Sequence, residues 1–173
     1  MADANTVEQS RSQRLADRLE RGANALAALA EGLTDAEWNM AVEGDGRTVG
    51  TVIHHVASVY PVEVELARTL ASGNKIEGVT MEGINKMNAD HAHQHTTVDK
   101  KTTIELLKAN SMAASAAIRG FTDAELDNAA PISLYSDAPL TAQFFIEDHA
   151  LRHSYHHLAR IRETLKGKAA LHE

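Results

Sequence analysis

Cysteine is absent from the 173-residue sequence. The chain therefore has no disulfide, no thiolate metal site and no cysteine nucleophile, and any thiol chemistry must use a thiol supplied by a small molecule. Proline and aromatic residues are also scarce, at 3 prolines and 4% aromatics. With 43% hydrophobic and 24% charged residues, this is the composition of a globular protein, and it favours helices over a loop-rich all-β fold.

Long hydrophobic runs and clustered basic residues are missing too. A membrane-spanning helix needs a run of about 18 apolar residues, and the sequence contains no run of that length. The N-terminal sequence MADANTVEQSRSQR has no apolar signal segment. The net charge is −7 and the basic residues are scattered, so we expect no positively charged surface that could bind the phosphates of a nucleic acid. We therefore expect a cytoplasmic protein that acts on a small molecule and binds neither membranes nor nucleic acid.

Hydrophobic periodicity predicts four long helical segments in one domain that covers residues 1–173. Leucines of the first segment recur at the spacing of an amphipathic helix, and the second segment is apolar around most of its circumference. The sequence HTTVD, residues 95–99, predicts a break inside the third segment. The four predicted segments span about residues 6–31, 48–71, 80–119 and 136–166. A four-helix bundle is the architecture that these segments favour.

Several residues predict where these segments begin or bend. Three pairs have the spacing of a helix capping box: Thr6 with Gln9, Thr34 with Glu37, and Thr122 with Glu125. Pro61 predicts a kink or break near residues 58–61, since it removes a backbone hydrogen bond. The last segment is expected to start at Ser136 or Asp137, with Pro139 in its first turn.

The sequence EDHALRHSYHHLARI, residues 147–161, contains four of the ten histidines. His153 and His157 are one helical turn and about 40° apart, so both imidazoles can reach one point beside the helix. His149 extends the same ridge by another turn and is a candidate general base. Arg160 lies about 20° from His153 on this face, where it can contact a substrate carboxylate.

A third metal ligand is expected from the sequence VIHHVA in the second segment. His55 follows Val52 by three residues and precedes Val59 by four, which places it on the buried stripe. Three protein ligands and one open position are the usual catalytic arrangement for zinc. The alternative is that each histidine is a hydrogen-bonded core or surface residue. Because Ser154 follows His153, the pair is not the zinc-protease motif, in which a glutamate follows the first histidine.

These two stretches together resemble the motifs of the DinB/YfiT-like superfamily of bacterial four-helix-bundle metalloproteins. RTVGTVIHHVASV is similar to the pattern W-S-V-x-E-V-L-x-H-L, with His55 on the metal-binding histidine. RHSYHHLARI is similar to H-x-x-x-H-R-G-Q-I, with His153 and His157 on its two ligands. Arg47 stands where the family often has tryptophan, and LAR replaces RGQ at residues 158–160.

The resemblance implies an all-α four-helix bundle with long inter-helix connections and a three-histidine site for a divalent metal, most often zinc or nickel. Dimers are common in families of this kind, so the resemblance allows a homodimer. The better understood members are thiol transferases that use bacillithiol, mycothiol or glutathione, and one branch isomerises maleylpyruvate with a thiol cofactor. The family does not imply DNA binding.

Three functions follow as hypotheses. The first is a metal-dependent thiol S-transferase that joins a low-molecular-weight thiol to a small electrophile. The second is a hydrolase, lyase or isomerase that uses metal-bound hydroxide, with His149, Glu63 or Asp148 as the base. The third is a non-enzymatic stress protein that binds a metal or a small ligand.

The remaining histidines receive simpler interpretations. His91, His93 and His95 recur at intervals of two, which does not fit one helical face, so we interpret them as a solvated loop or helix end rather than a second metal site. His54 and His156 are expected to surround the ligands. A metal-bound imidazole usually donates its other N–H to an acceptor, for which the candidates are Glu63, Glu65, Glu147 and Asp148. Trp38 is expected to plug the core.

Overall fold

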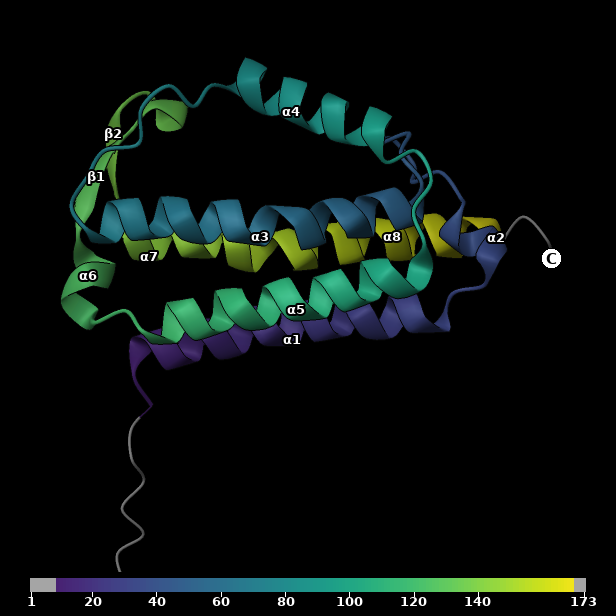
Figure 1. The fold of residues 1–173 in the computed structure, drawn as a ribbon, viewed down its shortest axis with the longest axis horizontal. Coiled ribbons are helices and arrows are strands. Elements are labelled where there is room, and N and C mark those ends of the chain that lie inside the picture. Colours follow the sequence, from purple (N-terminus) through teal and green to yellow (C-terminus); the bar gives the residue numbers. More distant parts are fainter. Residues whose placement is uncertain (1–8, 170–173) are drawn as a thin grey trace, which may run out of the picture.

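The computed structural model describes residues 9–169, most of which are helical (Figure 1). In chain order the elements are α1 (Arg11–Gly32), α2 (Asp35–Trp38), α3 (Val49–Ala71), α4 (Met81–Gln94), α5 (Lys100–Arg119), α6 (Asp123–Asp127), β1 (Ala129–Ile132), a 3-10 turn (Ser133–Tyr135), β2 (Ala138–Thr141), α7 (Ala142–Phe145), a π-helical turn (Ile146–Leu151) and α8 (Arg152–Ala169).

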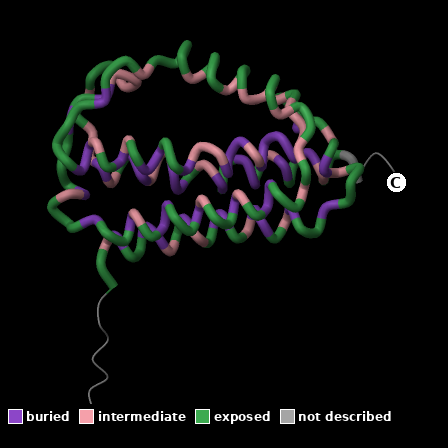
Figure 2. The backbone as a smooth tube through the Cα atoms, viewed as in Figure 1, coloured by how far each residue is buried: buried purple, intermediate pink, exposed green. Residues whose placement is uncertain are grey.

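Four long helices form the bundle, and the predicted fold class is confirmed. Helix α5 packs against α1 and α3, and α8 also packs against both. The buried apolar residues form one core cluster, and buried positions recur along each of the four bundle helices (Figure 2), as amphipathic helices require. Helices α3 and α5 run in one direction and α1 and α8 in the other (Figure 1). Within residues 9–169, no helix is long and apolar enough to cross a membrane.

Helix α4 lies outside this bundle. It carries the chain back along the outer side of α3, from the end of α3 to the start of α5 (Figure 1). None of its residues is buried (Figure 2). The predicted break in this segment is confirmed, because α4 ends at Gln94 and α5 begins at Lys100 with Asp99 as its N-cap. Helix α4 therefore covers the bundle without contributing to its core.

Two of the three predicted capping boxes are confirmed. Thr34 with Glu37 opens α2, and Thr122 with Glu125 opens α6. Thr6, of the third predicted box, lies outside the described residues. Helix α1 begins at Arg11 instead, where a capping box that includes Ser10 satisfies the first free N–H groups.

Helix α3 continues unbroken through Pro61, so the predicted break does not occur. A proline cannot donate the backbone hydrogen bond to the carbonyl four residues earlier, which here belongs to Ala57. The Asn110 side chain on α5 donates to that carbonyl at 2.8 Å. A neighbouring helix thus replaces the bond that proline removes, which lets α3 remain continuous within the bundle.

The predicted start of the last helix is wrong. Ser136 and Asp137 have φ values of 56° and 60° and form the turn of a β-hairpin, and Pro139 lies in strand β2. Strands β1 and β2 pair in antiparallel register from Ala129↔Thr141 to Ile132↔Ala138. The helix begins only at Ala142, with Thr141 as its N-cap. The capping pattern of this sequence is also a turn pattern, and pairing with the neighbouring strand decides between them.

The hairpin also holds the connection between α3 and α4. The backbone N–H of Ile76 donates to the Pro131 carbonyl at 2.9 Å, and the N–H of Ser133 donates to the Ile76 carbonyl at 2.9 Å. The loop before α4 is thereby joined to the edge of β1. This contact sets the point from which α4 starts across the bundle.

Candidate metal centre and cavity

The three predicted metal ligands come together between α3 and α8. His55 is 5% exposed and lies on the buried stripe of α3, and His157 is 6% exposed. The ring centroids are 5.0 Å apart for His55 and His153, 5.6 Å for His55 and His157, and 5.0 Å for the stacked pair His153 and His157. Each ring offers a nitrogen within 4.8 Å of the nitrogens of the other two.

The nitrogen spacing suits a metal ion. The Nε2 atoms of His55 and His153 are 3.2 Å apart. Two ligands of a tetrahedral zinc ion with Zn–N bonds of about 2.0–2.1 Å are about 3.3 Å apart. His157 Nδ1 is buried without a hydrogen-bond partner among the described residues, and a buried polar atom of this kind commonly marks a position for an ion or water. The donor set therefore fits a divalent cation.

Burial keeps two of these imidazoles neutral. Desolvation by burial, with a smaller electrostatic contribution from the neighbouring His153, lowers the pKa of His55 to about 3 and that of His157 to about 2. Both rings are uncharged at neutral pH and present lone pairs. Neutral imidazole is the form that binds metal ions.

Glu63 fixes the orientation of His153. The Nδ1 atom of His153 lies 2.7 Å from Oε1 of Glu63, whose side chain is 9% exposed. A carboxylate accepts, so Nδ1 carries the proton and Nε2 keeps its lone pair on the side of His55. This is the carboxylate–histidine pair that commonly supports a metal ligand. Among the predicted acceptors, Glu63 is the residue that contacts a candidate ligand.

The other predicted acceptors lie elsewhere. Glu65 is exposed on α3, and Glu147 forms an ion pair with Arg18 of α1 at 2.7 Å. Asp148 accepts a hydrogen bond from Tyr135. His156 is exposed, with its ring centroid 5.1 Å from that of His157. The sequence indicates only the helix face on which each carboxylate lies. That information does not tell which of them contacts a candidate ligand.

A cavity of about 510 Å³ opens beside the three histidines. Its size is that of a small-molecule site. Its walls come from α3, α4, β1, the loop before α4, and the continuous run of α7, the π-helical turn and α8. Most of the lining is apolar, and the titratable groups in it are the three candidate ligands, Arg47, Glu63 and His149. The apolar lining residues are Val59, Val62, Leu66, Ile76, Val79, Ile84, Met87, Ile132, Leu134 and Phe145.

His149, the predicted base, lines this cavity from the π-helical turn. Its Nε2 atom lies 2.9 Å from the hydroxyl of Tyr135, and its ring stacks on Phe145 with centroids 4.3 Å apart. Because Tyr135 donates its proton to Asp148, its oxygen accepts from His149 Nε2. The lone pair of His149 is then on Nδ1. Burial lowers the pKa of His149, so the ring is neutral at neutral pH.

Sequence reasoning missed Tyr135 as a partner of His149. Tyr135 precedes the hairpin turn, in a segment interpreted as a connection, and no local motif marks it. The π-helical turn that carries His149 was also not expected; such turns are frequent at functional sites.

Arg160 and Arg47 differ in their relation to the cavity. Arg160 was predicted to act on the substrate, but it is not among the cavity-lining residues. Its guanidinium lies 3.2 Å from Asp45 Oδ2 and 3.1 Å from the Glu43 carbonyl. Arg47, considered only as a departure from a family pattern, does line the cavity. It is held by Asp45 at 2.6 Å and 2.9 Å, while its Nη1 is buried without a partner among the described residues.

The interpretation of the remaining histidines needs correction. His93 is exposed, as a solvated helix end requires, but His91 and His95 are half-buried. These two are four residues apart, and both lie against His54 on α3, with ring centroids 5.1 Å and 4.2 Å from it. His91 lies in α4 and His95 is its C-cap. Their four-residue spacing, which the intervals of two obscured, brings both rings to α3.

Comparison with known proteins places this chain in a family. The sequence model of the DinB superfamily matches residues 18–161. Among solved structures, YfiT from Bacillus subtilis, described as a probable metal-dependent hydrolase with an unusual four-helix bundle topology, superposes with a TM-score of 0.73 and 18% identity, covering 98% of this chain and 94% of that chain.

A second solved structure, a mycothiol-dependent maleylpyruvate isomerase, matches with a TM-score of 0.67 and 12% identity. The match covers 88% of this chain and 61% of that chain. At these identities both structures show a shared fold. No functionally curated protein matches the sequence.

Proposed function

This chain belongs to the DinB superfamily, and we propose that it is a metal-dependent enzyme that acts on a small molecule in the cavity beside His55, His153 and His157. The observation that carries the proposal is the position of these histidines. They converge from two helices at the wall of a largely apolar cavity of about 510 Å³. A histidine that serves only as a hydrogen-bonded core residue does not require two further histidines and a cavity beside it.

The protein groups around this site have separable roles. A divalent ion, which we propose to be zinc or nickel because both suit imidazole ligands, would keep its full charge among neutral ligands and lower the pKa of a thiol or water that binds it. Glu63 holds His153 with its Nε2 lone pair facing His55. The apolar walls exclude water and hold the apolar part of a substrate, while Arg47 offers one N–H group to a polar or anionic group at its end.

We propose a thiol S-transferase as the first candidate reaction. The chain has no cysteine, so the sulfur would come from a low-molecular-weight thiol. The apolar lining supports binding of an electrophile, such as an epoxide or an activated alkene, better than binding of a highly charged substrate. The shared fold with a thiol-dependent isomerase adds support to the choice of a thiol cofactor.

A hydrolase, lyase or isomerase that activates water is the second candidate, and one observation favours it. Oε2 of Glu63 is buried without a hydrogen-bond partner among the described residues, beside a candidate ligand. A free carboxylate oxygen at this point is placed to accept a proton from water. His149, with its lone pair on Nδ1, is the other candidate base.

The test compares reactions with and without thiol. Protein purified without an affinity tag is freed of metal, reloaded with zinc or nickel, and offered a panel of epoxides, activated alkenes and esters, alone and with glutathione, mycothiol or bacillithiol. Thiol-dependent turnover supports the transferase, and thiol-independent turnover supports the second candidate. Metal-loaded protein that is no faster than metal-free protein on any substrate indicates a binding protein instead.

Matched variants connect that turnover to the proposed ligands. His55→Ala removes one proposed ligand and is expected to abolish both turnover and metal retention at this site. His156→Ala removes an exposed imidazole beside His157 and is expected to retain both. If His55→Ala retains the same activity and the same metal content as the wild type, the ligand assignment is wrong.

A further inference from the structure

His54, His91 and His95 form a second cluster of imidazoles on an adjacent face of α3. His54 precedes His55 in the chain, and because consecutive helical residues are about 100° apart, His54 faces α4 while His55 faces α8. The ring centroids are 5.1 Å apart for His54 and His91, 4.2 Å for His54 and His95, and 4.6 Å for His91 and His95.

This cluster has the geometry of a metal site. Each ring offers a nitrogen within 4.8 Å of the other two, and Nδ1 of His54 is 2.9 Å from Nε2 of His91. Helix α4 supplies His91 and its C-cap residue His95, four residues apart, and α3 supplies the third histidine. This is also the arrangement of His153, His157 and His55.

Hydrogen bonding within the protein does not account for all these nitrogens. His54 Nδ1 lies 2.9 Å from His91 and 3.3 Å from the Ser58 hydroxyl. Nδ1 of His91 is buried without a partner among the described residues.

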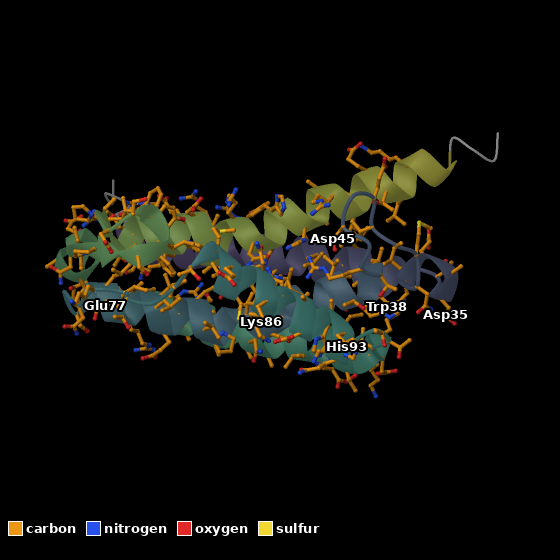
Figure 3. The ribbon with its side chains drawn as sticks, turned by 90° about the horizontal axis from the view of Figure 1, so that it is seen from above. Asp35, Trp38, Asp45, Glu77, Lys86 and His93 are labelled. Carbon is orange, nitrogen blue, oxygen red and sulfur yellow. The ribbon has the colours of Figure 1, made fainter. Side chains whose placement is uncertain are left out.

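Helix α4 has few other means of attachment. It contains no buried residue, although Gly83, Ile84, Met87 and Asn88 line the cavity as its roof. The loop before α4 is held by pairing with β1. Seen from above (Figure 3), α4 extends from the side of Glu77 past Lys86 to His93, near the end of the bundle that carries Trp38. At that end the Thr51 hydroxyl donates to the His95 carbonyl at 2.7 Å.

We propose that His54, His91 and His95 form a second divalent-metal site that fastens the C-terminal end of α4 to α3. Zinc is the expected ion, with nickel and copper also suited to imidazole ligands. Three protein nitrogens leave a coordination position for water. Because α4 roofs the cavity, this metal holds the roof in place instead of taking part in the reaction.

The two centres are neighbours. The rings of His55 and His91 contact each other edge to face, with centroids 5.4 Å apart. Two dications at such close sites repel, so the second ion binds more weakly than the first. Zinc is therefore expected to enter metal-free protein in two resolved steps.

Zinc stoichiometry tests the second site separately from the first. Tag-free, metal-free protein is titrated with zinc and followed by calorimetry and elemental analysis. Wild type is expected to bind two equivalents, and His95→Ala and His153→Ala one each, because each variant removes a ligand of a different site. His93→Ala removes an exposed histidine of the same helix and is expected to retain two. Wild-type binding of a single equivalent, or two equivalents retained by the His91→Ala/His95→Ala double variant, overturns the proposal.

Hydrogen exchange tests whether this metal fastens α4. In His153→Ala protein, which keeps only the second site, zinc at about ten times its Kd is expected to slow exchange of amides in α4 about tenfold. In His95→Ala protein the same zinc leaves α4 exchange unchanged. If α4 exchange is unaffected by zinc in His153→Ala protein, the fastening role is wrong. If instead His55, His153 and His157 do not bind metal, the zinc titration shows it, because His153→Ala protein then binds as much zinc as the wild type.

Discussion

His153 donates its Nδ1–H to Oε1 of Glu63 across 2.7 Å, from α8 to α3. This bond determines which nitrogen of His153 faces the other candidate ligands. Glu63→Gln is expected to weaken zinc binding at this site about 10-fold to 100-fold, because a neutral amide holds the imidazole less firmly and makes it less basic. Competition with a chelating indicator measures the change.

The matched control for this substitution is Glu65→Gln, which alters an exposed carboxylate on the same helix. Its zinc affinity is expected to equal that of the wild type. Equal affinities for Glu63→Gln and Glu65→Gln would contradict the orienting role of Glu63.

Acid is expected to destabilise the metal-free protein at pH values well above those at which ordinary carboxylates become protonated. Burial lowers the pKa of His55 to about 3 and of His157 to about 2, against 6.5 in an unfolded chain. Below pH 6.5 the unfolded state binds protons that the folded state does not, so the free energy of unfolding falls as the pH falls. Between pH 6.5 and pH 5 each histidine accounts for up to about 2 kcal/mol.

Urea unfolding of the metal-free protein at a series of pH values checks this dependence. In a His55→Gln/His157→Gln variant, the slope of stability against pH is expected to become shallower, because those two sites no longer titrate. A wild-type unfolding free energy that is the same at pH 5 and pH 7 is incompatible with the buried neutral histidines.

Gly50→Ala is expected to destabilise the protein by about 1 to 3 kcal/mol through overpacking. A Cβ at Gly50 would overlap the indole ring of Trp38. Trp38 is 4% exposed, as predicted for a core plug, and donates from Nε1 to the Val98 carbonyl at 3.0 Å. Gly32→Ala is the control, because a Cβ there meets nothing within 4 Å. Thermal unfolding followed by tryptophan fluorescence compares the two, and similar melting temperatures would show that the indole moves aside freely.

Asp45→Asn is expected to cost about 3 kcal/mol, since it leaves the partly buried Arg47 without its charge partner. The Asp45 side chain is 7% exposed and contacts both Arg47 and Arg160; it lies in the loop beside α8 (Figure 3). Hydrogen bonds from Arg47 also hold the pKa of Asp45 below its usual range.

Asp90→Asn provides the comparison for Asp45→Asn, because Asp90 forms an exposed ion pair with Lys86. Its expected cost is below about 1 kcal/mol. Chemical denaturation gives both values, and an Asp45→Asn protein that is as stable as Asp90→Asn would show that Asp45 adds little to the folded state.

The helices of the bundle, the buried side that carries His55 and the shared face of His153 and His157 could be predicted, because each depends on periodicity within one helix. The spacing of His55 from Val52 and Val59 places it on the buried side of α3, whatever the rest of the chain does. The β-hairpin could not be predicted in this way. Ser136 and Asp137 suit a helix cap and a turn equally well, and pairing between distant residues decided the outcome.

Contacts made by α4 were beyond sequence reasoning for a similar reason. The position of His91 beside His54 depends on the path that α4 takes across α3, and that path is set by the pairing of Ile76 with β1. Tyr135 reaches His149 only because the hairpin folds back on the last helix. Arg160 shares a helical face with His153, but its guanidinium contacts Asp45 and does not line the cavity.

Because α4 roofs the cavity and buries no residue, the fold separates what keeps the protein folded from what selects its ligand. Substitutions at Ile84 or Met87 reshape the cavity without removing a side chain from the bundle core. A change of ligand preference can therefore arise in α4 while the helices that hold the histidines stay packed as before.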